Sequence, residues 1–310
     1  MSDKIREVFS QSLYRCPVGI ELEIEFESMK KHFQGESWSH PFKVVTDGSL
    51  RMNGYEVVTK PFSMSKTPEV CESIIEKLWE YGQPVASPRC GLHVHVNVQE
   101  YTTEQFHNLV CNFLAIEEYL IPESRKGLLF CVSGRHQGDP LGEFKNAADS
   151  IVNGLNVREP LHVCTALSSS VSVLENTLKY SATNIACTPK LGSVEFRFME
   201  ATLNPEEISA WAIGLVKICE TLKDIPAEFF VGQCLQTGSL TQFKKVVPEE
   251  LKAFINTDVE CLNDFRYLRT LLQNQDVWRD SWFSIIQPKD SRRDRKRPHF
   301  YYGEDTIEFS

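Results

Sequence analysis

The chain has 310 residues, of which 42% are hydrophobic and 11% aromatic, and its 42 acidic and 33 basic residues give a net charge of -9. This hydrophobic content excludes an intrinsically disordered chain, and the acidic excess argues against nucleic-acid binding by the whole surface. The length indicates one large domain with an appendage, or two domains. We expect a catalytic domain over residues 1–222 and a mainly helical extension over residues 223–310.

The cysteines and the N-terminal segment indicate the cellular compartment. The ten cysteines contain no C-x-x-C pair, so neither a zinc ribbon nor a small disulfide framework is indicated. The opening segment MSDKIREVFSQSLYRCP lacks the apolar core of a signal peptide, and no apolar run approaches the ~20 residues of a membrane span. We therefore expect a cytoplasmic protein without a membrane partner.

The first predicted strand is VGIELEIEFE, residues 18–27, which alternates strictly between polar and apolar residues. Glu21, Glu23 and Glu25 share one face, and the hydrophobic residues between them share the other. The pattern is typical of a half-buried strand.

The next segment, DGSLRMNGYEVVTKP, places two β-type runs around Asn53-Gly54. This dipeptide is the strongest two-residue hairpin signal, and such a hairpin would set Arg51 opposite Glu56. The following segment SKTPEVCESIIEKLWEYG predicts a helix with Ser65 as its N-cap and Gly82 as its C-terminal stop.

The segment RCGLHVHVNV, residues 89–98, predicts a strand with His93, His95 and Asn97 on one face. Two imidazoles on one strand face more often serve a metal, a phosphate or acid-base chemistry than core packing. The alternative is a strand with a solvated polar side. A predicted helix follows, TTEQFHNLVCNFLAIEEYL, capped by Thr102 or Thr103.

Beyond the glycine-rich middle of the chain, GSVEFRFMEAT, residues 192–202, alternates again and places Glu195 and Arg197 on one face. The segment NPEEISAWAIGLVKICETL then predicts an amphipathic helix with Asn204 as N-cap and Pro205 at its first position. From Lys223 onward the pattern predicts shorter helical pieces.

These elements predict an α+β fold, in which an antiparallel sheet has one polar catalytic face and helices packed on the other. On neighbouring strands, the following ionisable residues would converge on the polar face: Glu21, Glu23, Glu56, His93, His95, Glu195 and Arg197. So many carboxylates would repel one another unless divalent cations compensate, and oxygen-rich ligand sets suit Mg²⁺ or Mn²⁺ more than zinc. Such a face fits phosphoryl transfer from ATP. Because neither G-x-x-x-x-G-K-[ST] nor G-x-G-x-x-G occurs, nucleotide binding would be metal-centred.

The ordered motifs GIELEIEF, DGSL, YEVVTKP, CGLHVHVNV and VEFRFMEATLNPEEISAW resemble those of the amidoligase family. This family is a branch of the carboxylate-amine ligases with a glutamine synthetase-like fold, and the resemblance covers residues 17 to 220. It implies an ATP-dependent ligase, in which a carboxylate attacks the γ-phosphate of ATP and an amine captures the resulting acyl phosphate. Phosphorylation gives the carboxylate a leaving group, and Mg²⁺ or Mn²⁺ neutralises charge.

The resemblance also implies the metal ligands. Glu21 and Glu23 would hold two metal ions, with help from Glu56. His93 would be a further metal ligand, and Glu195 would bind the metal that bridges the phosphates.

By the same resemblance, other polar residues would contact the substrates. His95 would contact ATP phosphates, and Arg197 would stabilise the transferring phosphate or hold the substrate carboxylate. Asp47 of the DGSL motif would lie near the amine site. The arginine that clamps ATP is not assigned uniquely: the candidates are Arg125, Arg135 and Arg89.

Two other functions remain open at the level of sequence. A metal-dependent hydrolase would use the same H-x-H and E-x-E residues without ATP, and a non-catalytic binding protein would keep only the fold. The basic run at residues 292–297 could bind nucleic acid or a nucleotide-linked substrate, and residues 298–310 suggest a terminal hairpin. The expected substrates are a small-molecule or peptide carboxylate and an amine, and an oligomer is compatible with the resemblance.

Overall fold

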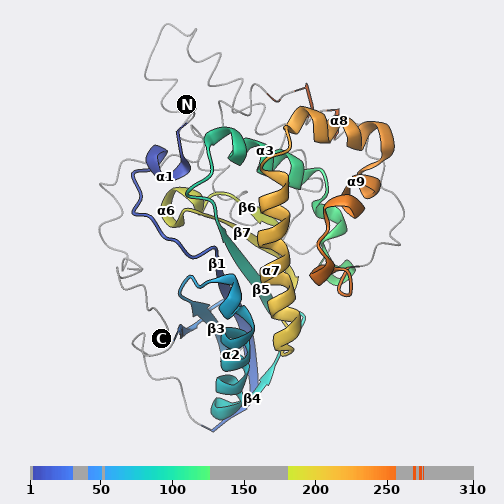
Figure 1. Ribbon diagram of the computed structural model, residues 1–310. Helices are drawn as coiled ribbons and strands as arrows, with labels where there is room; N and C mark the ends of the chain where they lie inside the picture. The colour runs from blue at the N-terminus through green and yellow to red at the C-terminus, as the bar shows by residue number, and fades with distance from the viewer. Residues whose placement is uncertain are drawn as a thin grey trace, which may run out of the picture.

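The computed structural model describes residues 3–30, 41–50, 53–125 and 181–255, with Leu268, Arg269, Leu272, Gln273 and Gln275 (Figure 1). The strands are β1 (Val18–Met29), β2 (Phe42–Thr46), β3 (Gly54–Thr59), β4 (Gly82–Val85), β5 (Gly91–Asn97), β6 (Thr183–Asn184) and β7 (Ser193–Glu200). The α-helices are α1 (Ile5–Val8), α2 (Thr67–Tyr81), α3 (Thr103–Leu114), α6 (Thr188–Leu191), α7 (Pro205–Leu222), α8 (Ala227–Thr237) and α9 (Ser239–Val246). The 3₁₀ turns are η1 (Met64–Lys66), η2 (Glu117–Tyr119), η3 (Glu123–Arg125) and η4 (Glu249–Leu251).

The described strands form one sheet in the order β2-β3-β1-β5-β7-β6. The remaining strand, β4, also pairs with β1 but lies outside this linear order. Every pairing is antiparallel. The predicted strands at residues 18–27, 89–98 and 192–202 are confirmed, and so is the α+β class. Because β1 lies between β3 and β5, the glutamates of β1 face both the hairpin arm and the histidine strand.

One face of the sheet is apolar and is covered by α2, α3 and α7 (Figure 1). Aromatic contacts join the two layers. The Phe113 ring of α3 lies 4.5 Å from the Phe196 ring, and the Trp211 ring of α7 lies 5.9 Å from the Phe198 ring, measured between centroids. Burial of these rings stabilises the layered arrangement and leaves the opposite, polar face for the ionisable side chains.

The helix termini follow the predicted capping residues in two of three cases. Asn204 Oδ1 accepts the Glu206 N–H at 3.0 Å, and Thr102 Oγ1 accepts the Gln105 N–H at 3.1 Å. The third prediction is wrong, because α2 begins after Lys66 and Ser65 lies in the preceding 3₁₀ turn. The hydrogen bonds accepted by Asn204 and Thr102 satisfy N–H groups that have no partner within the helix.

The predicted two-residue hairpin at Asn53-Gly54 is wrong. Glu56 pairs with Val45 and Tyr55 pairs with Thr46, so residues 47–53 form a longer connection between β2 and β3. Asn53 takes a left-handed φ of 66°, which Asn tolerates better than most residues, but it does so at the end of this connection. Arg51 lies outside the described residues.

Beyond Lys223 the described chain is helical, as predicted. Hydrophobic residues of α8 and α9, such as Phe230 and Phe243, belong to the same core as the sheet. Leu251 packs on α7 at Gly214, where an added Cβ would lie 2.3 Å from the Leu251 Cγ. The boundary at residue 222 stays a prediction. The basic run and the terminal hairpin lie outside the described residues, and no described helix is long and apolar enough to cross a membrane.

Candidate functional site

The polar face gathers ionisable side chains from four adjacent strands. On β1, Glu21 lies opposite His93 of β5, and Glu23 lies opposite Glu56 of β3. His95 lies opposite Glu195 of β7. The strand register therefore brings together side chains that the sequence placed on one face of separate strands, as expected from their alternation.

Glu21 lies at the centre of this cluster. Its Oε2 atom is 3.3 Å from His93 Nδ1, and its Oε1 atom is 3.2 Å from His95 Nε2. The other ring nitrogen of His95 lies 3.1 Å from Ser193 Oγ. His95 is therefore held on both sides, and Glu21 links the two histidines.

Glu195 forms the second side of the cluster. Its Oε1 atom is 3.6 Å from His93 Nδ1 and 3.4 Å from Arg197 Nε, and its Oε2 atom accepts Asn184 Nδ2 at 2.6 Å. This buried carboxylate is thus oriented by an amide on one oxygen and faces cationic or imidazole nitrogens with the other.

A bulge in β7 lies beside His93. Leu92 pairs with Met199 and Val94 pairs with Phe196, so an advance of two residues along β5 matches three residues along β7. As a result both Phe198 and Met199 are fully buried, and strict alternation ends just beyond Arg197. Bulges often occur next to active sites, where they redirect a side chain.

Glu23 is turned away from the centre of the cluster. Its Oε2 atom accepts the Gly91 N–H at 2.6 Å, and its Oε1 atom is 3.8 Å from His93 Nε2. Gly91 leaves little room, because an added Cβ would lie 2.9 Å from Arg125 Nη2 and 3.0 Å from His93 Nε2. The second glutamate of the E-x-E motif is therefore tied to the backbone of β5.

Two sets of side chains present donor atoms within 4.8 Å of one another. One contains Glu21, His95 and Glu195, and the other contains Glu21, Glu56 and His93. Each offers two carboxylates and one imidazole, a donor set that suits hard cations such as Mg²⁺ or Mn²⁺. Glu21 belongs to both sets and Glu23 to neither. The sequence predicted that Glu21 and Glu23 would both hold metal ions, and these two sets contain only the first of them.

Glu21 and His95 hold opposite charges. Burial alone lowers the pKa of His95, but the Glu21 carboxylate, a hydrogen bond to Cys187 and the charge of Glu195 together hold that pKa well above its ordinary value. In the same way, burial alone raises the pKa of Glu21, and the charges and hydrogen bonds of His95 and His93 together bring that pKa well below its usual range. A cation bound by His95 would have to displace its proton, so metal binding at this set would strengthen as pH rises.

Glu56 titrates in the opposite direction. Burial, followed by the charges of Glu21, Glu23 and Asp47, raises the pKa of Glu56 to about 9. A carboxylate that stays protonated beside other carboxylates marks a site of excess negative charge, which a cation would relieve.

The other predicted contacts lie at the edges of the cluster. Asp47 follows β2, where its Oδ1 atom accepts the Ser49 N–H at 2.8 Å. The buried Arg125 donates to the carbonyls of Cys90 at 3.2 Å and of Arg197 at 3.4 Å. Arg89 is exposed and donates to the Ser49 carbonyl. Arg135 lies outside the described residues.

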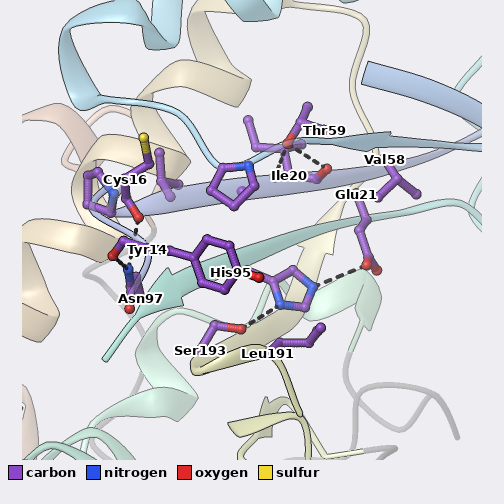
Figure 2. Close-up of a pocket in the computed structure, with 14 residues that line it drawn as sticks. Tyr14, Cys16, Ile20, Glu21, Val58, Thr59, His95, Asn97, Leu191 and Ser193 are labelled. Carbon is purple, nitrogen blue, oxygen red and sulfur yellow. Dashed lines mark hydrogen bonds and ion pairs between the residues drawn. The ribbon is translucent and has the colours of Figure 1, made fainter. Parts of the chain in front are cut away.

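A pocket adjoins the cluster at the end of β5 that carries Asn97 (Figure 2). Glu21 and His95 form one side of it, and its further lining residues include Tyr14, Cys16 and Leu191. This pocket was not predicted from the sequence, because its walls come from segments far apart in the chain. Asn97 was predicted on the polar face with the two histidines, and Ser193 could have been assigned there too, since it continues the alternation of Glu195 and Arg197.

The comparisons agree with the sequence motifs over the first part of the chain. Residues 15–130 match the model of a family described as "Putative amidoligase enzyme". A search of curated proteins finds no match. The matched segment contains Glu21, Glu56, His93 and His95. It ends before β7, the strand that carries Glu195 and Arg197. Over residues 15–130, the match confirms the amidoligase family that the sequence motifs indicated.

Proposed function

We propose that this protein is an ATP-dependent ligase that joins a carboxylate to an amine through an acyl phosphate, with Mg²⁺ or Mn²⁺ on its polar face. The observation that carries the proposal is the sharing of Glu21 between two sets of hard-cation ligands. The family match supports an enzyme of the ligase class. We further propose that the sheet is a glutamine synthetase-like catalytic fold.

In the proposed reaction, an oxygen of the substrate carboxylate attacks the γ-phosphorus of ATP, and ADP leaves. The amine nitrogen then attacks the carbonyl carbon of the acyl phosphate, and phosphate leaves as the amide bond forms. The divalent cations would neutralise phosphate charge in both steps. Glu21, Glu56, His93, His95 and Glu195 are the residues that would hold them.

The remaining polar residues would position the reactants. Arg197 lies beside Glu195, and its guanidinium would stabilise the transferring phosphate. Arg125 is tied to two backbone carbonyls at the base of β5, so we propose that it supports the strand ends around the site instead of clamping ATP. Asp47, near Glu56, would lie on the side where the amine enters.

The first test is thermal unfolding with a non-hydrolysable ATP analogue, with and without Mn²⁺. A ligand that binds only the folded state stabilises it by about 2.7 kcal/mol at a hundred times its dissociation constant. We expect metal-dependent stabilisation that Glu21→Gln abolishes. The matched control is Glu27→Gln, which changes an exposed glutamate of the same strand and should respond like the natural protein.

Turnover assays then separate the three classes of function. Release of ADP that requires one carboxylate and one amine together would support the ligase. Turnover of a substrate without ATP would instead support a metal-dependent hydrolase. Correctly folded protein without any nucleotide-dependent stabilisation would contradict the ligase and favour a non-catalytic binding protein.

A further inference from the structure

The pocket beside the cluster is bordered by β1, the end of β3, the end of β5 and α6. It extends from Glu21 and His95 to Tyr14 and Cys16, and Pro61 and Leu191 add apolar surface (Figure 2). A ligand whose apolar group fills this pocket would therefore have its other end beside the residues that would bind metal. The pocket thus fits a molecule with one uncharged, largely apolar part and one strongly charged part.

Gly19 lines this pocket, and neither the backbone nor local packing requires a glycine there. Its φ is not in the left-handed region, and an added Cβ would meet only His95 Cβ at 3.8 Å and Thr59 Oγ1 at 3.9 Å, which are ordinary contacts. Gly19 shares the polar face with Glu21, because the two are two residues apart on one strand. A longer side chain at this position would project toward the pocket and fill it.

Asn97 and Thr59, two polar side chains of the pocket wall, are already engaged within the protein. Asn97 Nδ2 donates to the carbonyls of Tyr14 at 2.7 Å and Cys16 at 3.0 Å, and its Oδ1 accepts the Gln99 N–H. Thr59 Oγ1 accepts the Ile20 N–H at 2.8 Å and donates to the Ile20 carbonyl at 3.2 Å. These groups are therefore poorly placed to read the hydrogen-bonding edge of a ligand.

We propose that Gly19 keeps this pocket open for the base of a nucleotide, and that the pocket selects the base by shape and apolar contact instead of hydrogen bonding. The identity of the ligand as a nucleotide rests on the proposed function. Apolar pockets discriminate weakly between rings that differ only in polar substituents, whereas sites built on hydrogen bonds discriminate strongly. Adenine and guanine nucleotides should accordingly bind with affinities within about tenfold of each other.

Alkylation of Cys16 gives a readout that is local to the pocket. Cys16 is a pocket residue of intermediate exposure, and burial raises the pKa of its thiol, so iodoacetamide should react with it slowly at mildly alkaline pH. With Mn²⁺ present, ATP and GTP should slow this alkylation to similar extents, and tripolyphosphate should not. Cys71, buried in α2, serves as the internal control for unfolding.

The test compares Gly19→Val with Gly19→Ala. We expect Gly19→Val to weaken ATP and GTP binding by about tenfold or more, because its methyl groups occupy the space of the ring. Stabilisation by tripolyphosphate with Mn²⁺ should persist in Gly19→Val, and Gly19→Ala should have a smaller effect. If Gly19→Val does not fold, Leu191→Phe fills the pocket from α6 and takes its place.

The possible outcomes separate this proposal from the ligase itself. Three results would each overturn the pocket assignment and leave the ligase proposal standing. They are nucleotide-dependent stabilisation without protection of Cys16, unchanged nucleotide binding by both pocket-filling variants, and discrimination between ATP and GTP beyond about a hundredfold. Protection of Cys16 by adenosine and guanosine, without metal-dependent binding of tripolyphosphate, would support the pocket and contradict the ligase site. Absence of both effects in folded protein would overturn both.

Discussion

Two glycines on the polar face, Gly19 and Gly91, differ in how much space surrounds them. An added Cβ at Gly91 would be in steric conflict with Arg125 and His93, whereas one at Gly19 would make ordinary contacts. The polar atoms around Gly91 are packed against its backbone, because Glu23 accepts its N–H. Residue 91 is thus a glycine because neighbouring side chains approach its Cα closely. At residue 19, no contact within the protein requires a glycine.

We predict that Gly91→Ala lowers the free energy of unfolding by about 1–3 kcal/mol, as overpacking of a well-packed site does. It should also weaken Mn²⁺ binding, because the new methyl group would displace His93. Urea denaturation and calorimetric metal titration measure the two effects. Gly19→Ala is the matched control and should leave stability within about 0.5 kcal/mol of the natural protein; equal losses in both variants would contradict the packing argument.

Glu56 supplies a pH prediction. Its pKa of about 9 in the folded protein lies above its ordinary value of 4.5, so between these values the folded state binds more protons than the unfolded state. The free energy of unfolding without metal should therefore fall as pH rises through this window, by at most about 1.4 kcal/mol per pH unit for one proton. Urea denaturation in the presence of a chelator at several pH values measures this slope.

The variant Glu56→Gln should flatten that dependence, because glutamine does not titrate. Glu27→Gln, which changes an exposed glutamate of the neighbouring strand β1, should retain the slope of the natural protein. A slope unchanged by Glu56→Gln would assign the effect to another group.

At the scale of elements, α7 is the central helix on the apolar face, and Asn204 caps its N-terminus. We predict that Asn204→Ala lowers the free energy of unfolding by about 1 kcal/mol, the usual cost of losing an N-cap. Asn204→Asp should retain most of the stability, because its carboxylate accepts the same N–H. Urea denaturation measures both, and loss of stability in the aspartate variant as well would show that the cap bond is not the cause.

The bulge of β7 is an element-scale feature of the site. An unbroken β7 would have kept one residue of β7 opposite each residue of β5, but the shift beside His93 adds one residue to β7. The carbonyl of Arg197 at this bulge accepts a hydrogen bond from Arg125. The bulge therefore connects the candidate phosphate-binding arginine to a buried guanidinium from η3.

At the scale of the whole molecule, the helices beyond residue 222 complete the core. Asn112 Nδ2 donates to the carbonyls of Leu222 and Ile225, so α3 is bonded to the turn between α7 and α8. The hydrophobic residues of α8, α9 and η4 that contact this core include Phe230, Val231, Phe243 and Leu251. The sheet and the described C-terminal helices thus share one apolar interior.

We predict that a chain truncated after residue 222 does not fold to a stable state, because removal of these helices exposes the apolar surface that they cover. Circular dichroism and heat denaturation of the truncated chain test this. The control is the full chain, which should unfold with coincident transitions for secondary structure and for tryptophan fluorescence, to which the buried Trp211 of α7 contributes. A stable 1–222 fragment would instead support the domain boundary predicted from the sequence.

The sequence by itself determined the strands that carry the site, and the reason is local. Alternation with period two fixes which side of a strand Glu21, His93, His95 and Glu195 occupy, and it does so without knowledge of the partners. The caps of α3 and α7 were equally readable, because a cap bond spans two or three residues. The α+β class followed from the same patterns.

The tertiary structure alone decided how these side chains meet. The register of β1 with β3 and β5 makes Glu21 the common member of two ligand sets and turns Glu23 toward Gly91. It also replaces the predicted tight hairpin by a longer connection and builds a pocket from Tyr14, Gly19 and Leu191, which lie far apart in the chain. Such contacts join distant residues, and their geometry depends on how whole strands and helices pack, which no local pattern encodes.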